Sequence, residues 1–117
     1  MDDERDFAAS RLAPFGKRSE VIQGFFHDAV RRFEDGSLDF VYIDGFAKSG
    51  SEEAKTFDQW WPKLKPGGTF AGHDYAGSFP KVKKFVDGYM KGKNLEFWIT
   101  KEPIKEKSWF TLKPLSP

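Results

Sequence analysis

The sequence predicts an α/β fold built on a mostly parallel sheet, and two observations support that prediction. The first is the run Leu38–Ile43, which is apolar or aromatic everywhere except Asp39 and has turn-forming residues on both sides. Because strand side chains alternate, this run presents apolar groups to both faces, which is typical of a central strand covered on both sides. The second is the alternation of strand-like and helix-like segments, which is typical of parallel strands joined by right-handed crossovers.

Each element is expected from its local pattern. Strands are expected where short apolar or alternating runs lie between turn formers, and helices where apolar residues recur every three to four positions. Pro62 ends one helix and Pro80 begins the next, because proline lacks the amide proton that a helix interior needs. The expected helices are 2–12, 25–33, 51–61 and 80 to 88 or 92, and the expected strands are 19–23, 38–43, 69–73, 95–100 and 108–113, the last two forming an antiparallel pair.

The length and composition indicate one globular domain, residues 1–117. A chain of 117 residues with 38% hydrophobic and 32% charged residues buries one core. Aromatic residues make up 17% of the chain, which is more bulk than so small an interior is expected to hold. We therefore expect part of this aromatic surface to lie in a subunit interface.

Charge and hydropathy exclude several classes of partner. The net charge of +1 gives no electrostatic basis for binding nucleic acid. No apolar run approaches the roughly 18 residues that a membrane span needs, and the acidic residues after Met1 do not suit a signal peptide. The absence of cysteine excludes disulfides and thiolate metal sites. These features predict a cytoplasmic protein with no membrane and no nucleic-acid partner.

Three segments follow one another in a recognisable order and spacing: Ser37–Gly45 (SLDFVYIDG), Trp60–Gly68 (WWPKLKPGG) and Ala71–Tyr75 (AGHDY). Together they resemble class I S-adenosylmethionine-dependent methyltransferases of the type that act on small molecules. The resemblance runs from about residue 5 to the C-terminus. It implies S-adenosylmethionine as the cofactor and a small molecule as the methyl acceptor.

The resemblance covers only the later part of such a domain. It implies that 19–23, 38–43 and 69–73 are the third, fourth and fifth strands of the family, and that 95–100 and 108–113 are the sixth and the antiparallel seventh. Nothing corresponds to the first strand with its Gly-rich cofactor loop, or to the acidic residue that binds the ribose after the second strand. The implied fold is a truncated Rossmann-like sheet of order 3-4-5-7-6, in place of the family order 3-2-1-4-5-7-6.

This truncation has a consequence for the two faces of the sheet. Crossovers that all move in one direction place the three connecting helices on one face. The other face then keeps at most the helix at 2–12, and an apolar face of a parallel sheet does not stay open to water. We therefore expect a homo-oligomer, a dimer, in which a second subunit covers this face.

Polar residues follow two of the expected strands. Asp44 comes directly after the run 38–43, and His73 and Asp74 end the strand at 69–73. Because ligands of open α/β sheets bind beyond the carboxyl ends of the strands, we interpret His73 and Asp74 as catalytic and His73 as a general base. By resemblance to metal-dependent methyltransferases, Asp44 and Asp74 are expected to supply the hard oxygen ligands of a divalent metal, with His73 as a borderline ligand in the alternative to its role as a base. In the alternative interpretation, Asp44 caps the following segment and Asp74 forms a turn.

The resemblance also implies which residues contact the cofactor. Gly24 and Phe25 lie where the family approaches the adenine after its third strand. Asp44 and Gly45 end the fourth strand, and Phe46 is placed to stack on the adenine. The alternative for Phe46 is a core or interface position.

Two hypotheses describe the function. In the first, the chain is a methyltransferase-like domain that lacks the S-adenosylmethionine-binding half, is inactive alone and forms oligomers. In the second, it is an active methyltransferase of a small molecule, whose site is completed by another chain or by an omitted N-terminal segment. Binding of S-adenosylmethionine by the isolated chain discriminates between them.

Overall fold

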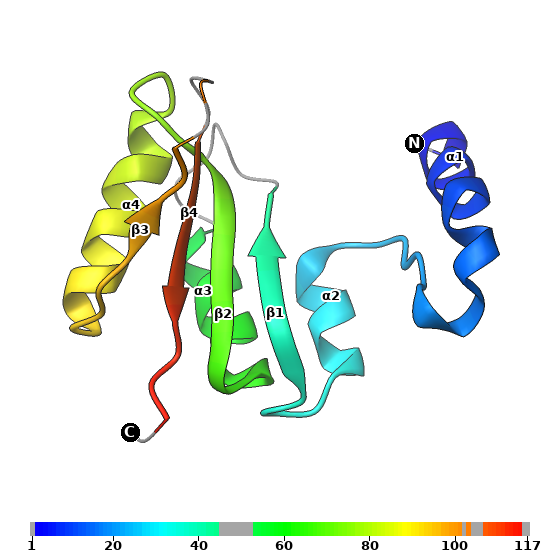
Figure 1. Cartoon of the computed structure of the whole chain (residues 1–117), viewed down its shortest axis with the longest axis horizontal. Helices are drawn as coiled ribbons and strands as arrows, with labels where there is room; N and C mark the ends of the chain where they lie inside the picture. Colours follow the sequence, from blue (N-terminus) through cyan, green and yellow to red (C-terminus); the bar gives the residue numbers. More distant parts are fainter. Residues whose placement is uncertain (1, 45–52, 102, 104–106, 116–117) are drawn as a thin grey trace.

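The computed structural model describes residues 2–44, 53–101, 103 and 107–115 (Figure 1). Its helical elements are α1 (Asp2–Leu12), η1 (Ala13–Arg18), α2 (Phe26–Ala29), η2 (Val30–Arg32), α3 (Glu53–Trp60), η3 (Trp61–Lys63) and α4 (Pro80–Gly92). Its strands are β1 (Leu38–Ile43), β2 (Leu64–Tyr75), β3 (Trp98–Ile99) and β4 (Lys107–Leu112). No helix in this part of the chain is both long and apolar enough to cross a membrane.

The strands form a mixed sheet of order β1-β2-β4-β3, which confirms the α/β class. β1 and β2 are parallel and are joined by α3, whereas β4 runs antiparallel to both β2 and β3. This order corresponds to 4-5-7-6 in the expected 3-4-5-7-6. The two C-terminal strands pair as expected, but β3 spans only Trp98–Ile99.

The expected strand at 19–23 is wrong, and it changes the place of β1. Within the described residues, 19–23 has no strand partner, so β1 lies at the edge of the sheet and not at its centre. The segment has only two apolar residues, Val21 and Ile22. Burying these two side chains does not offset the conformational entropy lost when the segment is ordered as a strand. It is held instead toward α1, where Arg5 Nη1 donates to Gln23 Oε1 at 2.7 Å.

The core lies on one face of the sheet, under α3 and α4. Phe57 of α3 contacts the rings of Phe70 and Trp109 at centroid distances of 5.2 and 5.3 Å. The apolar side of α4 adds the buried residues Val82, Val86 and Met90. The crossover helices therefore cover one face, as expected. α2 and η2 lie beside β1, where Phe33 contacts Trp60 of α3 at 5.7 Å (Figure 1).

The opposite face of the sheet is open. Figure 1 shows this face with no helix in front of β1, β2 and β4. The helix at 2–12, which was at most expected to remain on this face, does not cover it: α1 stands apart from the sheet and Phe7 is exposed (Figure 1). The apolar residues of α1 do not form a continuous stripe, so this helix has no face to bury. The outlying helix gives the chain a radius of gyration of 15.1 Å, above the roughly 13 Å of a compact domain of this length.

Trp109 and Gly72 meet at the centre of the covered face. They are register partners on neighbouring strands, and Trp109 is 1% exposed. A Cβ atom on Gly72 would lie 2.5 Å from Cζ2 of the indole ring. The ring fills the space above the glycine, so this position admits no side chain.

We expect Gly72→Ala to lower the free energy of unfolding by about 1–3 kcal/mol, because the enclosed indole cannot move aside without repacking the core. Urea denaturation followed by tryptophan fluorescence measures the change. The matched control is Gly88→Ala in α4, where an added Cβ meets nothing within 4 Å and the better helix former is expected to stabilise by about 0.5–1 kcal/mol. Equal stability of the Gly72 variant and the unmodified chain contradicts the packing argument.

Candidate functional site

A β-bulge near the carboxyl end of β2 shapes the candidate site. Gly72 pairs with Trp109 and Tyr75 pairs with Lys107, so two residues of β2, His73 and Asp74, lie opposite the single residue Ser108 of β4. Asp74 takes a left-handed backbone conformation, with φ of 64°, which aspartate tolerates better than most residues. Bulges of this kind turn side chains out of the regular strand alternation and are frequent beside active sites.

Three side chains at the bulge form a hydrogen-bonded chain across β1, β2 and β4. The Tyr42 hydroxyl lies 2.7 Å from Ser108 Oγ and 3.2 Å from His73 Nδ1. All three residues lie on the open face of the sheet. A hydroxyl both donates and accepts, so Tyr42 satisfies the imidazole nitrogen in either tautomer.

His73 also contacts the carboxylate of its neighbour. Its Nε2 lies 3.6 Å from Oδ1 of Asp74, and the two side chains are 28% and 15% exposed. The imidazole is thus held at Nδ1 by Tyr42 and faces a carboxylate at Nε2. Contacts at both ring nitrogens fix the orientation of the imidazole, which is the geometric requirement for a general base. The structure therefore brings together His73 and Asp74, which the sequence predicts as catalytic.

Asp44 lies at the same end of the sheet. It follows Ile43, the register partner of Gly72, and is exposed. The described residues, which include Asp44, His73 and Asp74, contain no group of three or more His, Cys, Asp or Glu side chains able to hold a metal. The divalent metal at Asp44 and Asp74 gains no support from this geometry.

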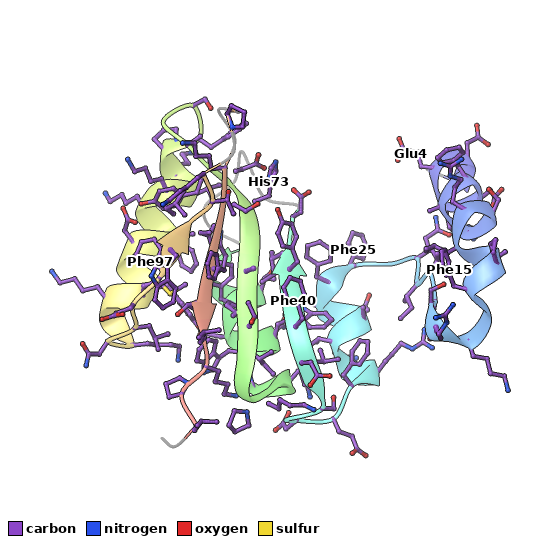
Figure 2. The ribbon with its side chains drawn as sticks, in the orientation of Figure 1. Glu4, Phe15, Phe25, Phe40, His73 and Phe97 are labelled. Atoms are coloured by element: carbon purple, nitrogen blue, oxygen red, sulfur yellow. The ribbon has the colours of Figure 1, made fainter. Side chains whose placement is uncertain are left out.

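The predicted cofactor contacts are divided between described and undescribed residues. Gly24 and Phe25 precede α2, whose amino end lies at the same end of the sheet as the tip of β1 (Figure 1). The Phe25 ring is 71% exposed and stacks on His27 at 5.4 Å (Figure 2). Gly45 and Phe46 lie outside the described residues.

Sequence reasoning missed Tyr42 and Ser108. Tyr42 counted as an apolar strand residue, although its hydroxyl makes the contacts that hold His73. Alternation along the strand places positions 69, 71 and 73 on one face, but only the β1–β2 register shows that Tyr42 lies on the same face. Ser108 likewise had no local signal, because its place opposite the bulge depends on the β2–β4 register.

We expect Tyr42→Phe to change the imidazole ¹⁵N chemical shifts of His73 in a two-dimensional NMR spectrum, because Nδ1 loses its hydroxyl partner. The chain has only two histidines, so His27 is an internal control whose shifts are expected to stay the same. The free energy of unfolding is expected to fall by about 0.5–1.5 kcal/mol. Unchanged His73 shifts contradict the hydrogen-bonded chain.

Tyr75, the last residue of β2, carries a pH-dependent contribution to stability. Burial, followed by the hydrogen bond that its hydroxyl donates to Asp87 Oδ1 at 2.6 Å, raises the pKa of Tyr75 to about 12. Burial also raises the pKa of Tyr89. A phenol whose folded-state pKa lies above its ordinary value of 10.0 favours the folded state below pH 10, and this advantage is lost as the pH rises toward about 12.

We expect the phenolate absorbance of Tyr75 to develop near pH 12 in the folded protein, and the free energy of unfolding to decline between pH 10 and 12. Spectrophotometric titration and urea denaturation at each pH measure the two effects. Tyr75→Phe removes this contribution, so its stability is expected to decline less steeply over that interval. A slope equal to that of the unmodified chain contradicts the assignment.

Comparison with known proteins identifies the family. The model of a methyltransferase domain family matches residues 1–75. No curated protein matches the chain. Among solved structures, a protein from Corynebacterium glutamicum is 15% identical with a TM-score of 0.76, and the match covers 100% of this chain and 59% of that one.

Two further structures carry descriptive names. An O-methyltransferase family protein from Burkholderia thailandensis is 15% identical, with a TM-score of 0.73 over 97% of this chain and 42% of that one. A SAM-dependent O-methyltransferase from Thermotoga maritima is 17% identical, with a TM-score of 0.59 over 97% of this chain and 47% of that one. The chain thus spans less than two thirds of each of these structures, and at such identities the likeness shows the fold. The family model matches well over half of the sequence, and the chain therefore belongs to the methyltransferase domain family.

Proposed function

We propose that this chain is a methyltransferase-like domain that does not turn over S-adenosylmethionine by itself and that self-associates. The observation that supports it most is that the chain has residues suited to proton transfer but lacks the sequence features that bind the cofactor. The chain supplies an oriented His73 beside Asp74, but its sequence has no Gly-rich loop between a strand and a helix and no acidic residue for the ribose. The exposed ring of Phe25 offers a stacking surface for an adenine, which is one contact among the many that hold such a cofactor.

The alternative is an active methyltransferase of a small molecule, whose site is completed by another chain or by a preceding segment. The geometry at His73 favours it. When bound, the sulfonium cofactor supplies the methyl group to an acceptor hydroxyl. His73 Nε2 would take the proton of that hydroxyl while Tyr42 holds Nδ1 and Asp74 stabilises the imidazolium. The O-methyltransferase names of similar structures are consistent with a hydroxyl acceptor.

Isothermal titration of the isolated chain with S-adenosylmethionine and S-adenosylhomocysteine separates the two functions. We expect a dissociation constant weaker than about 1 mM, because one exposed aromatic ring supplies less than the roughly 4 kcal/mol that this affinity requires. The longer Thermotoga maritima O-methyltransferase serves as the positive control for the titration.

Micromolar binding would overturn the proposal in favour of the alternative. In that event Phe25→Ala is the discriminating variant. If the variant no longer binds, the adenine stacks on Phe25; if its binding is unchanged, the adenine contacts other residues. Circular dichroism confirms that the variant is folded, which is expected because the ring is exposed.

A further inference from the structure

The open face of the sheet carries two rows of side chains that run across the strands. Register pairs join Tyr42 to Ala71, Ala71 to Phe110 and Phe110 to Trp98, so one row crosses all four strands. A second row joins Phe40, Thr69 and Leu112. The rings of Trp98 and Phe110 stack at 5.5 Å, and those of Phe40 and Tyr42 lie nearly parallel at 6.4 Å. These two rows are called the aromatic face below.

The aromatic face is exposed to a degree unusual for such residues. Phe40 is 58% exposed, Tyr42 and Trp98 are 43% each, and Leu112 is 51%. With side chains of roughly 200 Å² each, these four alone expose on the order of 400 Å². That is about half of the roughly 800 Å² that each partner contributes to a standard stable interface. A patch of this size matches the largest apolar patch of a typical monomer, which is often functional.

The chemistry of the aromatic face suits an identical partner. None of the positions in the two rows holds Asp, Glu, Lys or Arg, so two copies of the face meet without repulsion between like charges. The polar groups on the same side are already paired, since Tyr42 joins Ser108 and His73 through its hydroxyl. Burying groups that have hydrogen-bond partners avoids most of the desolvation cost. A charged partner, by contrast, finds no counter-charge here.

We propose that the aromatic face packs against the same face of a second copy of this chain across a twofold axis. This inference rests on the self-association in the proposed function and adds the surface through which it occurs. Two sheets meeting face to face lie about 10 Å apart, which leaves room for interlocking aromatic side chains from both copies. α1 does not obstruct this approach, because it stands beside the sheet and not in front of it (Figure 1). Phe40, labelled in Figure 2, lies on the edge strand β1, at one end of the second row.

Sedimentation velocity of the unmodified chain and of surface variants tests the interface. We expect a dimer with a dissociation constant of about 10 μM or tighter, within the micromolar-to-picomolar range that interfaces of standard size span. Phe40→Glu is expected to weaken it at least about 100-fold, because each copy then buries an uncompensated carboxylate in an apolar contact. The matched control is Phe7→Glu in α1, which is 65% exposed and lies off the face, and it is expected to leave the dimer unchanged.

A second measurement does not depend on whether the Phe40→Glu variant folds. The chain has no cysteine, so a single introduced thiol reports on one position. A short bismaleimide linker is expected to join two copies of Thr69→Cys, on inner strand β2 of the aromatic face, and not two copies of Lys84→Cys on the exposed side of α4.

A monomer at about 100 μM overturns the proposal, since that concentration exceeds any dissociation constant expected for this interface. A dimer that Phe40→Glu leaves intact, or equal cross-linking at both cysteine positions, also overturns it, while self-association through another surface stands. Neither result bears on cofactor binding, which the titration with S-adenosylmethionine measures separately.

Discussion

The contact between Trp109 and Gly72 is the constraint on which the rest of the fold depends. It lies in a row of the covered face that runs from Ile43 through Gly72 and Trp109 to Ile99, one residue from each strand. Only a residue without a side chain allows the indole to lie flat against β2, and only then do Phe57 and Phe70 close around the ring. The helices α3 and α4 therefore pack on this face. In the described part of the chain, the packed core lies on the side of the sheet that α3 and α4 cover.

This one-sidedness explains the contrast between the two faces of β1. Val41 is buried among the core residues, whereas its neighbours Phe40 and Tyr42 remain exposed although they are equally suited to a core. The sequence of β1 is that of a strand covered on both sides, but its position is that of an edge strand with one face covered. Similar solved structures extend well beyond the length of this chain, and the match covers 59% of the one from Corynebacterium glutamicum. Burying these exposed apolar side chains against another protein surface is favourable, because it removes them from water.

Local sequence determined most of the elements but not all of their contacts. The bounds of β1 match the apolar run 38–43, α1 matches 2–12, and α4 begins at Pro80, because these limits are encoded by turn formers and proline. The prediction of a strand at 19–23 is wrong because strand pairing requires a neighbouring strand, which no local pattern reveals. Gln23 instead accepts a hydrogen bond from Arg5. At the site, His73 and Asp74 were found by their place at a strand end. Two further features depend on register across three strands: the bulge that sets His73 and Asp74 opposite Ser108, and the Tyr42 hydroxyl that lies between His73 and Ser108.

The aromatic face and the candidate site share Tyr42, so the proposed assembly would also change the surroundings of His73, whose Nδ1 lies 3.2 Å from the Tyr42 hydroxyl. A second copy packed on the aromatic face would exclude water from the Tyr42–His73–Ser108 chain and strengthen its hydrogen bonds, because the local dielectric constant falls. Asp44, by contrast, lies beyond the end of β1 and is exposed at the sheet's edge. Self-association would thus enclose the imidazole of His73, which in the single chain stands at the open face of the sheet near the carboxyl ends of β1 and β2, the end at which ligands bind α/β sheets.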